Sequence, residues 1–163
     1  MPLTLEELKL ITDARNFEKL VGEVENEFFD AKGRVYHFDA GDYAKRELAK
    51  DVTAFANAGG GYIFIGARTV VSTVAFGEEV KELLPLSSEL IDPERYYKVV
   101  TEWVYPQPNG LRVEWHPFGA DGKGLGVLIV PTQEERSKPF LITKTIEGAD
   151  LEAAQQTFAV GFD

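Results

Sequence analysis

Apolar and polar residues follow helical spacing in three segments of this chain. From Asp42 to Asn57 the apolar positions recur every three or four residues, which predicts an amphipathic helix. Residues 4–22 show the same spacing in one or two segments. A further helix is expected to begin at Asp92-Pro93-Glu94 and to stop before Pro106, because Asp caps a helix and Pro fits its first turn. The pattern therefore predicts two or three helices.

Short β-branched and aromatic runs between these helices predict the strands. Tyr62–Ile65 is continuously apolar and bounded by glycine, which is typical of a strand buried on both faces. Strands are expected at 27–32, 62–67, 111–115 and 125–130, the last two as a hairpin, with weaker candidates at 69–76 (strand or extended loop), 138–142 and 157–160. We predict an α+β fold in one domain, residues 1–163, with a mixed β-sheet flanked by two or three helices.

A triple glycine joins the helix 42–57 to the apolar strand. Glycine and asparagine tolerate left-handed backbone angles, so we expect the helix to stop abruptly there. A turn of this kind can leave backbone N–H groups open to phosphate oxygens, which makes Asn57, Gly59, Gly60 and Gly61 candidate contacts. The alternative is a tight turn that serves packing alone. No Gly-Lys-Ser/Thr follows the glycines, which excludes a Walker loop.

Composition places the 163-residue chain among soluble globular proteins, with 44% hydrophobic and 27% charged residues. It has no cysteine, so disulfides and thiolate zinc sites are excluded, and a reducing cytoplasm is the expected compartment. We expect no signal peptide, because the first residues lack a basic start and an apolar run. No stretch approaches the roughly 18 apolar residues of a membrane helix, so no membrane partner is expected.

The formal net charge of −10 disfavours a broad nucleic-acid-binding surface. A polyanion site would have to be local, and four basic residues near the glycine turn are the candidates: Lys45, Arg46 and Lys50 on the predicted helix, and Arg68 beyond the strand. Acidic residues three or four positions away can instead pair with the helical ones as ordinary surface charges. A second use of the acidity is contact with a basic protein partner, and a homodimer stays open.

Three features resemble the Schlafen/AlbA-type DNA-binding domain. The first is Glu25, four residues, Asp30, one residue, Lys32. The second is the helix, glycine turn and strand from Asp51 to Gly66, and the third is Val130-Pro131 followed by Lys138-Pro139-Phe140. Together they span about residues 23–142. The resemblance implies a module that binds DNA or RNA, with a regulatory rather than strongly catalytic role.

The resemblance also implies a candidate catalytic set, Glu25, Asp30 and Lys32. Two neighbouring carboxylates, here Glu25 and Asp30, can hold Mg²⁺ or Mn²⁺, and a lysine can stabilise charge on a phosphoryl group. Nuclease-competent relatives carry a third acidic residue after the Gly-Val that ends the central strand, whereas this chain reads Gly66-Ala67-Arg68-Thr69. Nucleic-acid binding is therefore the leading hypothesis. A metal-dependent RNA endonuclease and an acidic protein-interaction domain are the alternatives.

Overall fold

The computed structural model describes residues 2–144. Its helices are α1 (Leu5–Ala14), α2 (Asp42–Asn57) and α3 (Pro93–Trp103), with 3-10 turns at Phe17–Leu20, Phe38–Ala40, Ser88–Leu90 and Glu135–Ser137. Its strands are β1 (Phe29–Lys32), β2 (Gly61–Ile65), β3 (Ala67–Val71), β4 (Glu78–Leu83), β5 (Leu86–Ser87), β6 (Val104–Tyr105), β7 (Arg112–Pro117), β8 (Lys123–Val130) and β9 (Leu141–Ile142).

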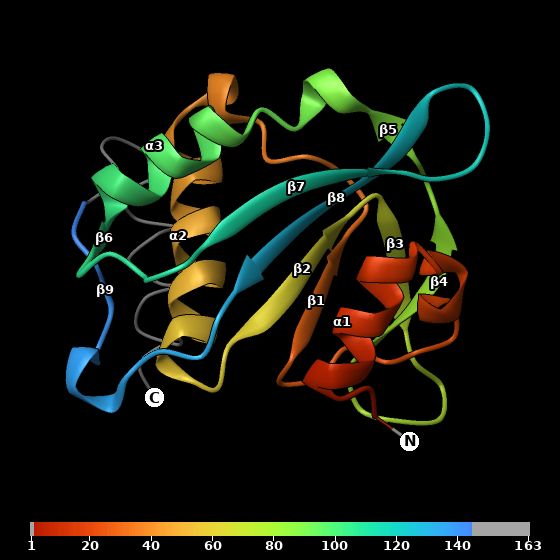
Figure 1. The fold of residues 1–163 in the computed structure, drawn as a ribbon, viewed down its shortest axis with the longest axis horizontal. Helices are drawn as coiled ribbons and strands as arrows, with labels where there is room; N and C mark the ends of the chain where they lie inside the picture. The colour runs from red at the N-terminus through yellow and green to blue at the C-terminus, as the bar shows by residue number, and fades with distance from the viewer. Residues whose placement is uncertain (1, 145–163) are drawn as a thin grey trace.

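A five-stranded sheet runs through the centre of the molecule (Figure 1). β1 pairs in parallel with β2, and α2 makes the crossover between them. β2 pairs antiparallel with β8, which also pairs antiparallel with β7 and β5. The predicted α+β fold with a mixed sheet is therefore confirmed.

The residues of β2 alternate between two apolar cores, one on each face of the sheet. Ile63 and Ile65 pack in the core formed with α2 and α3. Tyr62 and Phe64 pack in the core formed with α1 and the 3-10 turn that follows it. Figure 1 shows α2 and α3 on one side and α1 on the other. The prediction that this strand is buried on both faces is confirmed.

The glycine turn lets α2 and β8 approach the start of β2 closely. Gly60 has a φ of +91°, and a Cβ at this position would lie 2.7 Å from the carbonyl oxygen of Val130. A Cβ on Gly61 would collide with the ring of Phe55 on α2. Both positions therefore require glycine for packing, and the predicted abrupt end of the helix at Asn57 is confirmed.

The predicted hairpin of 111–115 and 125–130 is confirmed as β7 and β8, each slightly longer than expected. Within 69–76 only the first part is strand, because β3 ends at Val71 and a turn leads to β4. The pattern did not predict β4, since a run of Glu and Lys with one buried apolar residue, Val80, lacks a strand signature.

Smaller differences concern the short strands at the edges. The two-residue strands β5 and β6 were not predicted, and the expected edge strand at 138–142 is reduced to β9. The candidate at 157–160 lies outside the described residues. Within residues 2–144, no helix combines the length and the apolar character needed to cross a bilayer.

Gly60→Ala tests the close approach at the glycine turn. Gly119 is the matched control, because its φ is also positive, at +79°, but a Cβ there would meet nothing within 4 Å. We expect Gly60→Ala to lower the free energy of unfolding by about 1–3 kcal/mol more than Gly119→Ala, since only the first adds overpacking to backbone strain. Urea denaturation measures both, and equal losses would contradict the packing argument.

Candidate nucleic-acid interface

The predicted residues Glu25, Asp30 and Lys32 lie together at β1, the edge strand of the central sheet. Phe29 and Ala31 point into the core, so Asp30 and Lys32 share the opposite face of the strand. Glu25 reaches them because the chain turns back before β1. Its Oε2 accepts a hydrogen bond of 2.6 Å from the backbone N–H of Ala31.

Asp51 on α2 joins this group, and sequence reasoning missed it. The ammonium of Lys32 lies between Asp30 Oδ2, at 2.9 Å, and Asp51 Oδ2, at 3.2 Å. Asp51 Oδ2 also accepts a hydrogen bond of 2.6 Å from the hydroxyl of Tyr36. We call Glu25, Asp30, Lys32, Tyr36 and Asp51 the carboxylate–lysine network. Its members tie β1 and the following loop to α2.

Burial and neighbouring charges shift the protonation of this network. Burial and a hydrogen bond with Asp30 raise the pKa of Glu25 from 4.5 to about 9, so this carboxyl holds a proton at neutral pH. Burial opposes the charge of Lys32, but the carboxylates of Asp51 and Asp30 outweigh it and raise its pKa. Burial, followed by Asp51, raises the pKa of Tyr36 well above its usual value. The lysine therefore stays charged and the tyrosine remains a donor.

The network as placed does not fit a divalent-metal site. Over residues 2–144, no three or more His, Cys, Asp or Glu side chains are grouped so that they could hold a metal ion. The geometry gives the reason: Lys32 already bridges Asp30 and Asp51, and Glu25 is bonded to Ala31 and Asp30. The role of Glu25 and Asp30 as metal ligands stays a prediction without support from this geometry.

Arg68 belongs to the stretch 66–69, where the resemblance led us to expect a third carboxylate, and it lies on β3 apart from the network. Its Nε is 2.7 Å from Glu82 Oε1 on the neighbouring strand β4. Both side chains are exposed. Arg68 therefore supplies neither the missing carboxylate nor an unpaired positive charge.

The basic residues of α2 were expected as candidate contacts for a polyanion, but they differ in exposure and in pairing. Arg46 is only 4% exposed, so the expectation that it presents charge to a ligand is wrong. It is spaced three residues from Ala49, which is also buried, and this spacing turns both toward the core. Lys45 lies 3.7 Å from Asp42 in an ion pair. Lys50 is exposed and has no ion-pair partner among residues 2–144.

The glycine turn is packed rather than open, which corrects the expectation of free amides there. The N–H of Gly60 donates to the carbonyl of Phe55 at 3.0 Å, and Gly60 and Gly61 are buried. Gly59 is partly exposed, but its carbonyl accepts from Thr132 at 2.7 Å. The side chain of Asn57 bonds both the N–H and the carbonyl of Phe140, at 2.6 and 3.0 Å. These residues stabilise the turn and the chain beside it.

Two adjoining hollows run along the network and α2. The first, about 580 Å³, is lined by the carboxylates of the network together with Lys50 and Glu27. The second, about 570 Å³, is lined by Tyr36, Arg34, His37 and Tyr43, among others. Lys32 and Glu47 line both hollows, which are therefore next to each other. We call this pair of hollows the groove.

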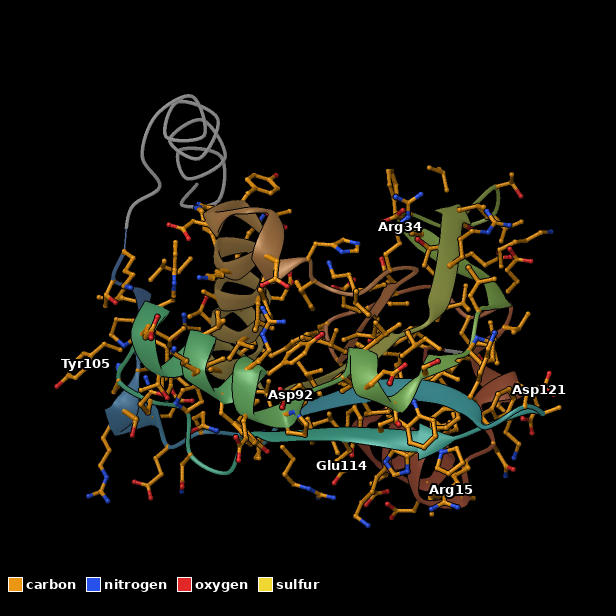
Figure 2. The ribbon with its side chains drawn as sticks, turned by 90° about the horizontal axis from the view of Figure 1, so that it is seen from above. Arg15, Arg34, Asp92, Tyr105, Glu114 and Asp121 are labelled. Atoms are coloured by element: carbon orange, nitrogen blue, oxygen red, sulfur yellow. The ribbon has the colours of Figure 1, made fainter. Side chains whose placement is uncertain are left out.

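Arg34 is the second functional candidate that sequence reasoning missed. It is exposed, lines the groove and has no ion-pair partner within the described part of the chain. Figure 2 shows it on the side of the molecule that carries the β3–β4 hairpin. The sequence did contain one indication of this role. Arg34 follows Lys32 by only two residues, and because β1 ends at Lys32, Arg34 remains close to the site.

Comparison with known proteins places the chain in a family. Residues 25–150 match the family described as Schlafen, AlbA_2, and the chain belongs to it, as the sequence motifs had indicated. Membership in this family supports a nucleic-acid-related domain. Among solved structures, one similar chain is the N-terminal domain of an ATP-dependent DNA helicase RecG-related protein from Nitrosomonas europaea. The two share 23% identity over 86% of this chain and 84% of the other, with a TM-score of 0.45.

The raised pKa of Glu25 predicts that stability depends on pH. Because the folded state binds this proton more tightly than the unfolded state, its contribution is complete below about pH 4.5 and is lost as the pH rises toward 9. Glu25→Gln keeps an acceptor for Ala31 and places a donor near Asp30. We expect this variant to flatten the decline in unfolding free energy between pH 5 and 9.

Urea denaturation across this pH range measures the effect. Glu23→Gln is the control, since it replaces the same type of side chain two residues away from Glu25. The prediction is contradicted if the stability of the wild type rises from pH 5 to 9 and Glu25→Gln shows the same profile. Glu25 would then not hold a proton in the folded state.

Proposed function

We propose that this protein is a nucleic-acid-binding domain whose groove contacts the phosphate backbone of DNA or RNA, with a regulatory rather than catalytic role in the cytoplasm. The observation that carries the proposal is the pair Lys50 and Arg34. Both are exposed, both line the groove and neither has an ion-pair partner in the described residues, in a chain of net charge −10. Unpaired basic side chains that flank a groove are suited to phosphate oxygens.

Lys32 contributes to the same surface from the centre of the groove. Its charge is partly shared with Asp30 and Asp51, so it orders the network and supplies a weaker attraction than its two basic neighbours. Glu27 and Glu47 also line the groove, and together with Asp30 and Asp51 they offset its basic side chains, so the attraction is confined to the surroundings of Lys50 and Arg34. We therefore propose binding that needs low or moderate salt, because the attraction is local and screened over about 10 Å at 0.1 M ionic strength.

The double variant Lys50→Ala, Arg34→Ala tests the interface. We expect weaker binding of a labelled single strand. We also expect a slope of log Kobs against log[salt] that is smaller in magnitude by about 1.4, because each lost phosphate contact contributes about 0.7. Fluorescence anisotropy over a salt series measures both quantities, for RNA and DNA of the same sequence and for the corresponding duplex.

Lys98→Ala is the matched control. This lysine is exposed on α3, outside the groove, and has no ion-pair partner within residues 2–144. The control variant should bind as the wild type does. The proposal fails if no nucleic acid binds at low salt, or if the double variant keeps the wild-type slope. If the protein binds a basic protein in a pulldown and does not bind nucleic acid, the alternative of an acidic protein-interaction domain is favoured instead.

The alternative of a metal-dependent RNA endonuclease is favoured by one observation, the convergence of Glu25, Asp30 and Asp51 at one groove. Against it, Lys32 bridges two of these carboxylates and the third holds a proton at neutral pH. We expect incubation with tRNA and Mn²⁺ to yield no cleavage above a buffer control on a denaturing gel. Cleavage that is lost in Glu25→Ala, Asp30→Ala would overturn the non-catalytic assignment.

A further inference from the structure

The turn between β3 and β4 exposes apolar side chains to solvent. Val71 and Val74 are largely exposed, and Phe76 is completely exposed. A surface aromatic ring that buries no area in the folded state adds no hydrophobic stabilisation to the fold, so its apolar surface is available to a partner.

The turn is ordered by its own hydrogen bonds. The hydroxyl of Ser72 accepts from the N–H groups of Val74 and Ala75, both at 3.2 Å. The N–H of Ser72 donates to the carbonyl of Gly77 at 3.0 Å, and this closes the turn. Phe76 is therefore presented from a fixed backbone, which lowers the entropy lost when a ligand contacts it.

Backbone contacts hold this turn beside the network. The N–H of Glu25 donates to the carbonyl of Glu78 at 2.8 Å, and the N–H of Val80 donates to the carbonyl of Glu23 at 2.9 Å. A Cβ on Gly77 would lie 3.3 Å from the side chain of Val24. Phe76 thus lies next to the segment that carries Glu25 into the groove.

The groove extends beyond its two hollows at the other end. A third hollow, about 530 Å³, is lined by Phe38, Arg95 and Tyr96, among others, and it shares Tyr36 and His37 with the second. Each hollow therefore shares lining residues with the next one. A polymer in extended conformation is suited to contact neighbouring hollows one after another.

Resting on the proposed function, we propose that the groove takes single-stranded nucleic acid and that Phe76 stacks on an unpaired base at the end of the groove near Glu25. Single strands offer free base faces, and aromatic side chains bind them with little regard to sequence. Glu78 and Glu79 lie next to the turn and repel phosphates. The chemistry of the turn therefore favours contact with a base over contact with the backbone.

Phe76→Ala tests the stacking contact, with a labelled oligouridylate of about 12 nucleotides as the probe. We expect affinity to fall about 5- to 150-fold, the range measured for loss of one base–aromatic stack. The salt slope should not change, because the substitution removes no charge. Phe76→Trp should restore binding, since indole offers a larger stacking face.

Tyr105→Ala is the matched control. Tyr105 is 70% exposed and lies at the opposite end of the molecule from the β3–β4 hairpin (Figure 2). This variant should bind the probe as the wild type does. The inference is overturned if the wild type binds duplex as tightly as single strand, or if Phe76→Ala binds the single strand with wild-type affinity. Either result is compatible with nucleic-acid binding by the groove. The proposed function itself fails only if no nucleic acid binds, or if the Lys50→Ala, Arg34→Ala variant keeps the wild-type slope of log Kobs against log[salt].

Discussion

The complete burial of β2 is the constraint on which the rest of this structure depends. Because the strand faces apolar cores on both sides, helices must cover both faces of the sheet at its centre. The parallel pairing with β1 then requires a crossover, which α2 provides. Only a turn without side chains lets α2 end directly at the strand, as the close contacts of Gly60 and Gly61 show. The groove forms where this crossover passes β1.

The same crossover explains why the network is where it is. Asp30 and Lys32 alternate with buried residues along β1, so they face outward beside α2. Asp51 lies on α2, and its Oδ2 is 3.2 Å from the ammonium of Lys32. Tyr36 lies in the loop between β1 and α2, and its hydroxyl donates a hydrogen bond to the same oxygen. The partly buried carboxylates of Asp30 and Asp51 would lose stability without partners, and Lys32 and Tyr36 are those partners. The network therefore stabilises the crossover as well as shaping the groove.

Sequence patterns predicted the features that depend on local spacing. The bounds of α2, the burial of Tyr62–Ile65 and the β7–β8 hairpin follow from periodicity, capping and turn chemistry. Asp51 could not be found this way, because its proximity to Lys32 arises only when the crossover closes. Arg34 is close to Lys32 in the sequence, but its place in the groove beside residues of α2 depends on the same crossover. Arg46 was misjudged for a related reason: its charge suggested solvent, but its helical position turns it inward.

The arrangement of charge in the groove suits the proposed binding better than it suits catalysis. A lysine that already bridges two carboxylates has little freedom to follow charge that develops during a reaction, and a carboxyl that carries a proton at neutral pH is a poor ligand for a cation. Lys50 and Arg34 lie outside this network and line the same groove, and neither has an ion-pair partner among residues 2–144. The groups of the network are hydrogen-bonded or ion-paired to one another, which stabilises the fold. The basic side chains at its edge are available to a ligand, as the proposed binding surface requires. A metal-dependent nuclease would instead need carboxylates that are free to hold a metal, whereas Lys32 already pairs with two of those in the groove.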